Sequence, residues 1–466
     1  MIDEFKEEFA DDPRCVLNYP VEVLDAVAPG ELDDIHLDLA RRRFASAMAD
    51  IPFIAQLALL NNIAEVSAFD DLVPLLYTHE VFKSYPQAWL ENGDFGKLTK
   101  WLGKLCAADL GKVDTSQCEL IEDWMAALIA QSEIDVQISA SADGKSAFMP
   151  RSHGEWAFLQ QMNLKGLRTA KNAQGEVTGL EPGVDRVPLV YLGARRGARS
   201  MSRFLDLYEE TYGEGLVDTL FENSDSDLLS LAGRIREASR KGEAVQVRPE
   251  LLARKDDIAR INADRPARME ALMQRMLNDY KGKRIFCFGT MQLVYDLAVR
   301  FREMGVTGAY APDSLFMCGS GFANGVEPPN WKQEVVEVLG IPESAIRVGY
   351  SMQEALWSMN KCDHDRFHMP ASIIPYVLDE NDKPLPREGR QTGRFAFFDL
   401  LPDTAWGGFA TGDKVTVTWD EPCGCGRRSA HLDSPITRIV TTQEDKITCA
   451  GTAGALEEAT DFLLKS

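Results

Sequence analysis

Four short polar segments of this sequence carry side chains that could bind a phosphorylated ligand. The first, residues 138–146, reads Ile-Ser-Ala-Ser-Ala-Asp-Gly-Lys-Ser and directly follows a candidate strand. Small residues followed by Gly144 and Lys145 suit a tight loop whose backbone N–H groups and lysine face phosphate oxygens. A Walker loop is excluded, because its leading glycine is absent at the required spacing. A polar surface turn is the alternative for this segment judged by itself.

The second segment, residues 349–354, reads Gly-Tyr-Ser-Met-Gln-Glu and follows a strand-like run. The ring of Tyr350 offers a π-face to a base, and the carboxylate of Glu354 is the kind of ligand that a hard cation takes. The alternative is a strand-to-helix turn with a core tyrosine and a solvated glutamate.

The third and fourth segments would complete such a site. Residues 318–322 read Cys-Gly-Ser-Gly-Phe at the end of an apolar run, and glycines there allow a ligand to approach the backbone closely. Residues 410–413 read Ala-Thr-Gly-Asp, and the two acceptor oxygens of Asp413 suit a vicinal diol. A glycine turn and a hairpin turn are the respective alternatives.

In this order, the four segments resemble the motifs of the adenylate-forming (acyl-AMP) superfamily. The closest resemblance is to its phenylacetate–CoA ligase and acyl-protein synthetase branch, which includes the fatty-acid–protein ligases of bacterial luminescence. The family motifs are Thr-Ser-Gly-Thr-Thr-Gly-Lys, Tyr-Gly-Met-Thr-Glu and Tyr-Arg-Thr-Gly-Asp. The resemblance runs from residue 138 to residue 413.

The resemblance implies ATP-dependent activation of a carboxylic acid, aryl or fatty, as acyl-AMP. The acyl group would then pass to a thiol of a protein cysteine, a carrier or CoA. Lys145 would face the phosphates and Glu354 would hold Mg²⁺, which makes these two the expected catalytic residues, while Tyr350 packs on adenine and Asp413 binds the ribose. The expected nucleotide-binding set is Ser139, Ser141, Gly144, Lys145, Gly319, Ser320, Gly321, Tyr350, Ser351, Met352 and Asp413.

Several residues depart from the family pattern. Ser141 stands where the family has glycine, Ala142 replaces a hydroxyl residue, Asp143 places a carboxylate beside the expected triphosphate, and Ala410 replaces an arginine. These departures, together with Ala450 in place of a further family arginine and the short C-terminal tail, favour an alternative function. In it the protein is a non-catalytic or ATP-independent relative that serves as an acyl-binding or partner module.

A separate group of soft ligands predicts a structural zinc ion. Cys362 and His368 lie in one short segment, and Cys423 and Cys425 lie in another. Thiolates and imidazoles in two such knuckles are what tetrahedral zinc requires, and His364 is the substitute for His368. Some phenylacetate–CoA ligase relatives have a similar arrangement. Reduced free cysteines are the alternative.

The hydrophobic pattern predicts the elements that position these residues. Apolar residues at three- and four-residue spacing predict helices over Leu37–Leu60 and Leu120–Ile129, in a mostly helical region of about 130 residues. Alternating strands and helices follow, and then short strands and turns, which indicates an α/β fold with a β-rich end. The expected strands are 187–192, 284–288, 314–318, 394–400, 414–419, 436–440 and 446–449, with helical stretches at about 251–280 and 454–464.

We therefore expect an α/β protein with a large, multilobed adenylate-forming N-terminal domain and a truncated, small C-terminal domain. Residues 1–130 would be its helical N-terminal region, 131–440 the nucleotide- and acid-binding core, and 441–466 a short C-terminal remnant. Within that remnant, Asp445 is the candidate hinge. Cys449 is the candidate acyl-carrying cysteine, with a buried strand cysteine as the alternative.

Composition narrows the class of partners. The formal net charge of −22 argues against nucleic acid and anionic membranes, because both favour Lys and Arg. The acidic N-terminus lacks the layout of a signal peptide, and the apolar stretch 51–63 is too short to cross a bilayer. Nine cysteines suit a reducing compartment. We expect a cytoplasmic protein with no membrane span that binds a carboxylic acid and an acyl-acceptor protein or CoA, with a homo-oligomer left open.

Overall fold

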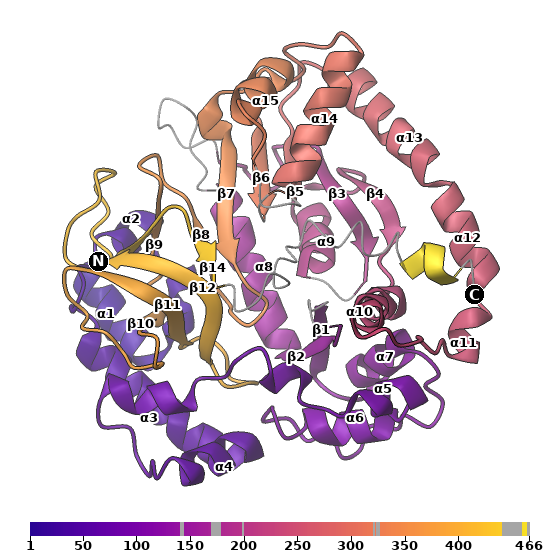
Figure 1. Ribbon diagram of the computed structural model, residues 1–466. Coiled ribbons are helices and arrows are strands. Elements are labelled where there is room, and N and C mark those ends of the chain that lie inside the picture. The colour runs from indigo at the N-terminus through magenta and orange to yellow at the C-terminus, as the bar shows by residue number, and fades with distance from the viewer. Residues whose placement is uncertain are drawn as a thin grey trace.

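The computed structural model of this 466-residue chain describes residues 1–139, 144–168, 179–197, 200–319, 322, 327–439 and 459–463. Its described strands form two six-stranded sheets and one two-stranded hairpin, with helices around them (Figure 1). The mixed α/β fold predicted from the sequence is confirmed. No single described helix is both long and apolar enough to cross a membrane; α3 and α4 reach that length and composition only as a pair bent by 109°.

The secondary-structure elements of the first 131 residues are all helices, as their periodicity predicted. The elements are α1 (Ile2–Asp11), η1 (Pro13–Leu17), α2 (Val21–Asp25), α3 (Asp33–Asp50), α4 (Pro52–Leu60), η2 (Phe69–Leu75), η3 (Val81–Lys83), α5 (Gln87–Asn92), α6 (Phe95–Leu102) and α7 (Ile121–Gln131). The helix expected over Leu37–Leu60 begins earlier and is divided in two at Pro52. Proline has no N–H for the preceding helix but is well suited to the first turn of a new one.

These N-terminal helices share their core with a sheet from the distal half of the chain. Phe5 and Phe44 belong to the same hydrophobic cluster as Phe397 and Val417. Figure 1 shows α1 and α3 beside strands β10 and β11. The helical region therefore buries its apolar face against residues more than 300 positions away.

The central sheet is mostly parallel and is covered by helices on both faces. Its strand order is β4 (Val217–Asn223), β3 (Leu189–Arg196), β5 (Phe286–Thr290), β6 (Leu315–Gly319), β7 (Ile346–Ser351) and β8 (Ser358–Asn360), and only β8 runs antiparallel to its neighbour. The helices that follow or connect these strands are α8 (His153–Arg168), α9 (Ser200–Tyr212), α10 (Ser226–Lys241), α11 (Pro249–Leu252), α12 (Lys255–Ala263), α13 (Arg265–Asn278), α14 (Met291–Glu303), η4 (Glu343–Ala345) and α15 (Trp331–Leu339).

Alternate residues of the parallel strands point to opposite layers. The row Leu189, Phe286 and Leu315 packs with α8 and α9, and the next row, which begins at Val190, packs with α13, α14 and α15. Both faces of the central sheet are thus buried under helices, which explains why the sequences of these strands are continuously apolar. The strands expected at 187–192, 284–288 and 314–318 are β3, β5 and β6, each starting one or two residues later. The helical stretch expected at about 251–280 is divided among α11, α12 and α13.

The second sheet is antiparallel, in the order β10 (Ile373–Leu378), β11 (Arg390–Asp399), β12 (Gly408–Thr418), β13 (His431–Asp433) and β9 (Arg366–His368), with β14 (Thr437–Arg438) also paired to β12. Strand β12 begins at Gly408 rather than at Lys414, so Asp413 lies within a strand and not in a hairpin turn. The pairing register shifts between Arg394, opposite Lys414, and Ala396, opposite Ala410, which leaves a bulge at residues 411–413. Bulges of this kind redirect side chains and are common near functional sites.

The remaining expected elements are partly described. Of the strand expected at 436–440, residues 436–439 are described, and among these Thr437–Arg438 form the paired strand β14. The strand expected at 446–449 lies outside the described residues, as do Asp445 and Cys449. Residues 459–463, within the expected last helix, are helical. The two-stranded hairpin consists of β1 (Ile134–Ser139) and β2 (Ala147–Ser152).

Candidate active site

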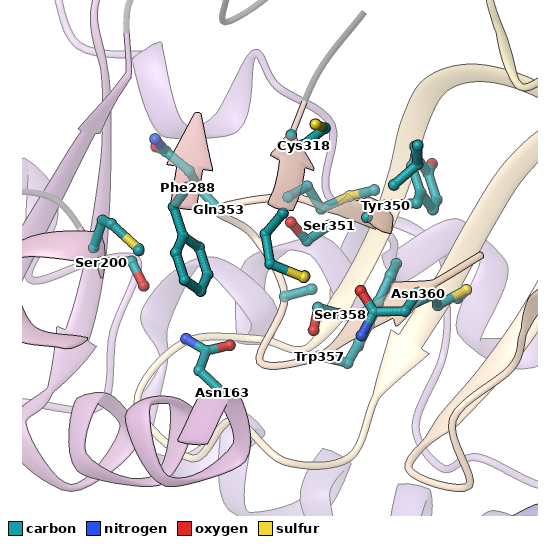
Figure 2. A pocket seen from close by; sticks show the side chains of 18 of the residues that line it. Asn163, Ser200, Phe288, Cys318, Tyr350, Ser351, Gln353, Trp357, Ser358 and Asn360 are labelled. Atoms are coloured by element: carbon teal, nitrogen blue, oxygen red, sulfur yellow. The ribbon is translucent and has the colours of Figure 1, made fainter. Parts of the chain in front are cut away.

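A cavity of about 2660 Å³ lies at the carboxyl ends of β5, β6 and β7, between the central sheet and the bulged strand β12. This is where open α/β sheets generally bind ligands. Of the predicted catalytic and nucleotide-binding residues, those that line it are Ser139, Gly319, Tyr350, Ser351, Met352, Glu354 and Asp413. Three of the predicted zinc ligands, Cys362, His368 and Cys425, also line it. Figure 2 shows its interior, with Phe288 and Cys318 at the ends of their strands and Tyr350 and Ser351 on the adjacent strand. Ser141, Asp143, Ser320 and Gly321 lie outside the described residues.

Asp413 and Tyr350 are joined by a hydrogen bond. The Tyr350 hydroxyl donates to Asp413 Oδ2 at 2.8 Å, and Arg438 Nη1 donates to Oδ1 at 2.9 Å. Arg438 reaches this position because β14 pairs Arg438 directly with Asp413 on β12. Burial, and then the neighbouring Asp413 carboxylate, raise the pKa of Tyr350 well above its usual value, so the phenol remains a donor. Both carboxylate oxygens of Asp413, the residue predicted to bind the ribose, therefore accept hydrogen bonds from other side chains of the protein.

The Glu354 carboxylate lies on the cavity wall and is held by a histidine from the N-terminal region. His79 Nδ1 lies 3.1 Å from Glu354 Oε1, and the Glu354 side chain is only 11% exposed. Burial raises the pKa of Glu354. The hydrogen bond and charge interaction with His79, together with the backbone N–H of Glu354 itself and the charge of Arg151, outweigh burial, and the net pKa is below the ordinary value. Glu354 is therefore ionised at neutral pH, and the ring nitrogen of His79 is the donor.

Buried charges fix the turn that presents Glu354. Arg151 Nη2 donates to the Gln353 carbonyl at 2.6 Å, on one side of Glu354. Asp399 Oδ2 accepts from the Leu356 N–H at 2.8 Å on the other side. Arg151 and Asp399 are 1% and 0% exposed. Burial raises the pKa of Asp399 to about 6, although the N–H groups of Leu356 and Leu401 and the charge of Arg151 lower it.

Lys145, the residue expected to face the phosphates, contacts Tyr85 in this structure. Its ammonium group donates to the Tyr85 carbonyl and lies 4.5 Å from the centroid of the Tyr85 ring. Gly144 adopts φ +83°, and a Cβ there would lie 2.7 Å from the Gly233 carbonyl oxygen on α10. The end of the β1–β2 loop is thus pressed against α10, which requires glycine at this position.

One part of the cavity, the compartment between Phe288 and Asn163, has a mixed lining. Phe288 and Asn163 face one another across it, with Ser200 nearby (Figure 2). Gln160 links the two polar residues, because its Nε2 donates to Ser200 Oγ and its Oε1 accepts from Asn163 Nδ2, both at 3.3 Å. An apolar ring opposite a row of amides and hydroxyls can hold an organic acid in one orientation.

The four predicted soft ligands converge on one point. Cys362, His368, Cys423 and Cys425 offer ligand atoms that all lie within 4.8 Å of one another. The Sγ atoms of Cys362 and Cys423 are 3.8 Å apart, and Cys425 Sγ lies 3.2 Å from His368 Nε2. Ligands of a tetrahedral zinc ion are separated by about 3.5 Å, so this donor set fits zinc. The ring of His364 lies against Gly424 beside this group.

Sequence reasoning did not identify His79, Arg438, Asn163 or Asp399 as parts of the site. Asp399 gave a weak signal, since it is a carboxylate within the otherwise apolar run 397–401. The contact between His79 and Glu354 joins positions 275 residues apart, which no local pattern reveals.

Two sheets meet at one cavity, with Tyr350, Glu354 and Asp413 on its wall, and the chain has the fold of a solved acyl-CoA ligase. 2-Hydroxyisobutyryl-CoA ligase, in complex with 2-HIB-AMP and CoA in its thioesterification state, is similar over 89% of this chain and 70% of its own, with a TM-score of 0.53 and 14% identity. Its open conformation matches 91% of this chain and 80% of its own, with a TM-score of 0.46 and 14% identity. A long-chain-fatty-acid–CoA ligase, FadD1 from Archaeoglobus fulgidus, matches 65% of this chain and 51% of its own, with a TM-score of 0.36 and 12% identity. The sequence matches no protein-family model and no curated protein.

Proposed function

We propose that this protein activates a carboxylic acid as an acyl adenylate and transfers the acyl group to a thiol. The observation that carries the proposal is the convergence of Tyr350, Glu354 and Asp413, from β7, the turn after it and β12, on one cavity. Similarity of fold to a ligase that binds an acyl adenylate and CoA supports it. A protein cysteine or a carrier is an equally suitable acceptor by chemistry.

In the first step, a carboxylate oxygen attacks the α-phosphorus of ATP, and pyrophosphate leaves. Tyr350 would pack on adenine and Asp413 would bind the ribose hydroxyls after exchanging its bonds with Tyr350 and Arg438. Glu354 supplies an oxygen ligand on the cavity wall, which fits Mg²⁺, and the ion when bound would neutralise phosphate charge. The chemistry then rests on position and electrostatics, with no protein nucleophile. In the second step a thiolate attacks the acyl carbonyl carbon and AMP leaves.

We further propose that the acid occupies the compartment between Phe288 and Asn163, and that Cys362, His368, Cys423 and Cys425 hold a structural zinc ion. A closed set of four ligands leaves no position for substrate. Zinc would therefore stabilise the region around the cavity without taking part in the reaction.

The test is a pyrophosphate-release assay over a panel of carboxylic acids, with and without CoA. Asp413→Ala and Glu354→Ala should each reduce acid-dependent release by at least about a hundredfold, because each removes a charge-assisted contact made in the transition state. Both variants should keep the melting temperature (Tm) of the wild type to within a few degrees. Turnover like that of the wild type in both variants would contradict the adenylation proposal.

A binding or partner module is the second candidate function. Two observations favour it: both oxygens of Asp413 accept hydrogen bonds within the protein, and Lys145 faces Tyr85. The two candidates differ in their response to ATP and Mg²⁺, since a ligand selective for the native state must raise its Tm. An increase in Tm with ATP–Mg²⁺ supports the enzyme, and none at millimolar nucleotide supports the module.

A further inference from the structure

His79 is placed beside the cavity by a contact between the N-terminal region and β12. The Tyr77 N–H donates to the Gly408 carbonyl at 2.9 Å, and the Ala410 N–H donates to the Tyr77 carbonyl at 2.8 Å. This isolated bridge fixes the chain two residues before His79 to the strand that carries Asp413. The His79 ring then packs edge-on against Phe409, with 5.0 Å between ring centroids. The backbone and the ring are both held, so the direction of the imidazole is defined.

From this position His79 reaches across to the turn after β7. Its Nδ1 lies 3.1 Å from Glu354 Oε1, and both residues line the cavity. A glutamate side chain has three rotatable bonds, so an unrestrained Glu354 would adopt several rotamers. One donated hydrogen bond to one oxygen selects a single orientation of the carboxylate. Arg151 and Asp399 fix only the backbone on either side of it.

We propose that His79 is a positioning residue for Glu354, which holds this carboxylate in the orientation in which it receives Mg²⁺ with the nucleotide. The inference rests on the proposed function and adds to it a residue from a different part of the chain. Pre-organised ligands bind metal more tightly, and loss of a neighbour that orients a metal ligand commonly lowers affinity by about tenfold or more. His79 would not touch the substrate or the reacting atoms.

The test compares His79→Ala with His79→Asn. The asparagine amide nitrogen occupies nearly the same place as Nδ1 and can donate the same hydrogen bond, whereas alanine cannot.

At fixed ATP, Mg²⁺ is titrated while two quantities are followed: the Mg²⁺-dependent rise in Tm, and the rate of acid-dependent pyrophosphate release. We expect His79→Ala to raise the Mg²⁺ concentration at half-effect by about tenfold in both measurements. His79→Asn should restore it to within about threefold and keep the Tm without ligands. His79→Ala should lower that Tm by a few degrees, because the mostly buried Glu354 carboxylate loses a hydrogen-bond donor. The matched control is His153→Ala, which removes an exposed histidine at the start of α8 and should behave as the wild type.

Two results would overturn the inference. In one, His79→Ala keeps the Mg²⁺ dependence of the wild type. In the other, the alanine and asparagine variants lose Tm and activity equally, which would show a role in packing alone. Wild-type protein that releases no pyrophosphate with any acid and shows no Mg²⁺-dependent rise in Tm with ATP would instead remove the proposed function, and the inference with it.

Discussion

At the scale of single residues, the site depends on a few positions at which the side chain is dictated by its neighbours. Gly144 is one of them, because it combines a left-handed backbone with direct contact to α10. Its φ is +83°, and an added Cβ would lie 2.4 Å from Glu237 Cβ and 2.7 Å from the Gly233 carbonyl oxygen. Neither backbone nor helix can move away without disturbing the end of the β1–β2 loop.

We therefore expect Gly144→Ala to lower the free energy of unfolding by about 2–4 kcal/mol, from backbone strain together with overpacking. Gly215→Ala is the matched control: Gly215 has φ +74°, and nothing lies within 4 Å of its added Cβ. That control should lose only about 1 kcal/mol, the strain of the left-handed conformation. Urea unfolding of the three proteins measures both values, and equal losses would show that contact with α10 adds nothing.

At the scale of elements, the sequence predicted the strands better than it predicted the site. Strands β3, β5 and β6 were evident because both of their faces are buried and their sequences are continuously apolar. The start of β12 was missed because Gly408 and residues 410–413 are mostly small, a pattern typical of a turn. The four candidate zinc ligands could be predicted from the sequence because Cys362 and His368 lie in one short segment, and Cys423 and Cys425 lie in another. His79 and Arg438 depend on contacts between distant segments, which require the assembled sheets.

Helices α7 and α10 illustrate such an assembled contact, because their N-terminal ends cap each other. Asp227 on α10 accepts from the N–H of Ile121 at 2.9 Å and of Glu122 at 3.4 Å on α7. In return, Glu122 Oε1 accepts from the Ser226 N–H at 2.7 Å. The first N–H groups of a helix have no partner within it, and acidic side chains are favoured there.

Burial raises the pKa of Asp227 from 3.8 to about 7, although the two N–H donors lower it. The folded protein thus binds this proton more tightly than the unfolded chain does. The stability from this group is complete below pH 4 and is lost as the pH rises through 7, by up to about 4 kcal/mol. The Asp227→Asn variant has no carboxyl group to titrate here, so it does not lose this stability as the pH rises. The unfolding free energy of the variant minus that of the wild type should therefore increase between pH 5 and pH 8. Urea unfolding across that range measures the difference, and a constant difference would contradict the assignment.

At the scale of the whole molecule, the cavity lies where the two large sheets meet, and each supplies part of the proposed nucleotide site. Tyr350 belongs to β7 of the central sheet, and Asp413 belongs to β12 of the antiparallel sheet. The chain crosses from one sheet to the other between β8 and β9, where Lys361 and Phe367 form an isolated bridge. Cys362 lies in this crossing and His368 ends β9, while Cys423 and Cys425 come from the segment between β12 and β13. A zinc ion on these four ligands would tie the crossing to the antiparallel sheet.

Metal removal should therefore affect both stability and nucleotide binding. Zinc is expected at one equivalent by elemental analysis, and a strong chelator should lower the Tm by several degrees, because a structural zinc ion contributes its binding free energy to folding. The same treatment should raise the ATP–Mg²⁺ concentration needed for half of the Tm increase, because Tyr350 and Asp413 lie on sheets that the ion would hold together. Cys425→Ser should show the same lower Tm and the same weaker response to ATP–Mg²⁺. Added zinc should restore both quantities in the chelator-treated wild type but not in this variant. Cys118→Ser is the control, since Cys118 is half-buried and lies far along the chain from the four ligands.

Protein that contains no zinc and keeps its Tm in chelator would show that the four ligands are reduced cysteines and a histidine packed together. A fall in Tm with unchanged ATP–Mg²⁺ binding would show that the ion stabilises the fold without coupling the two halves of the nucleotide site.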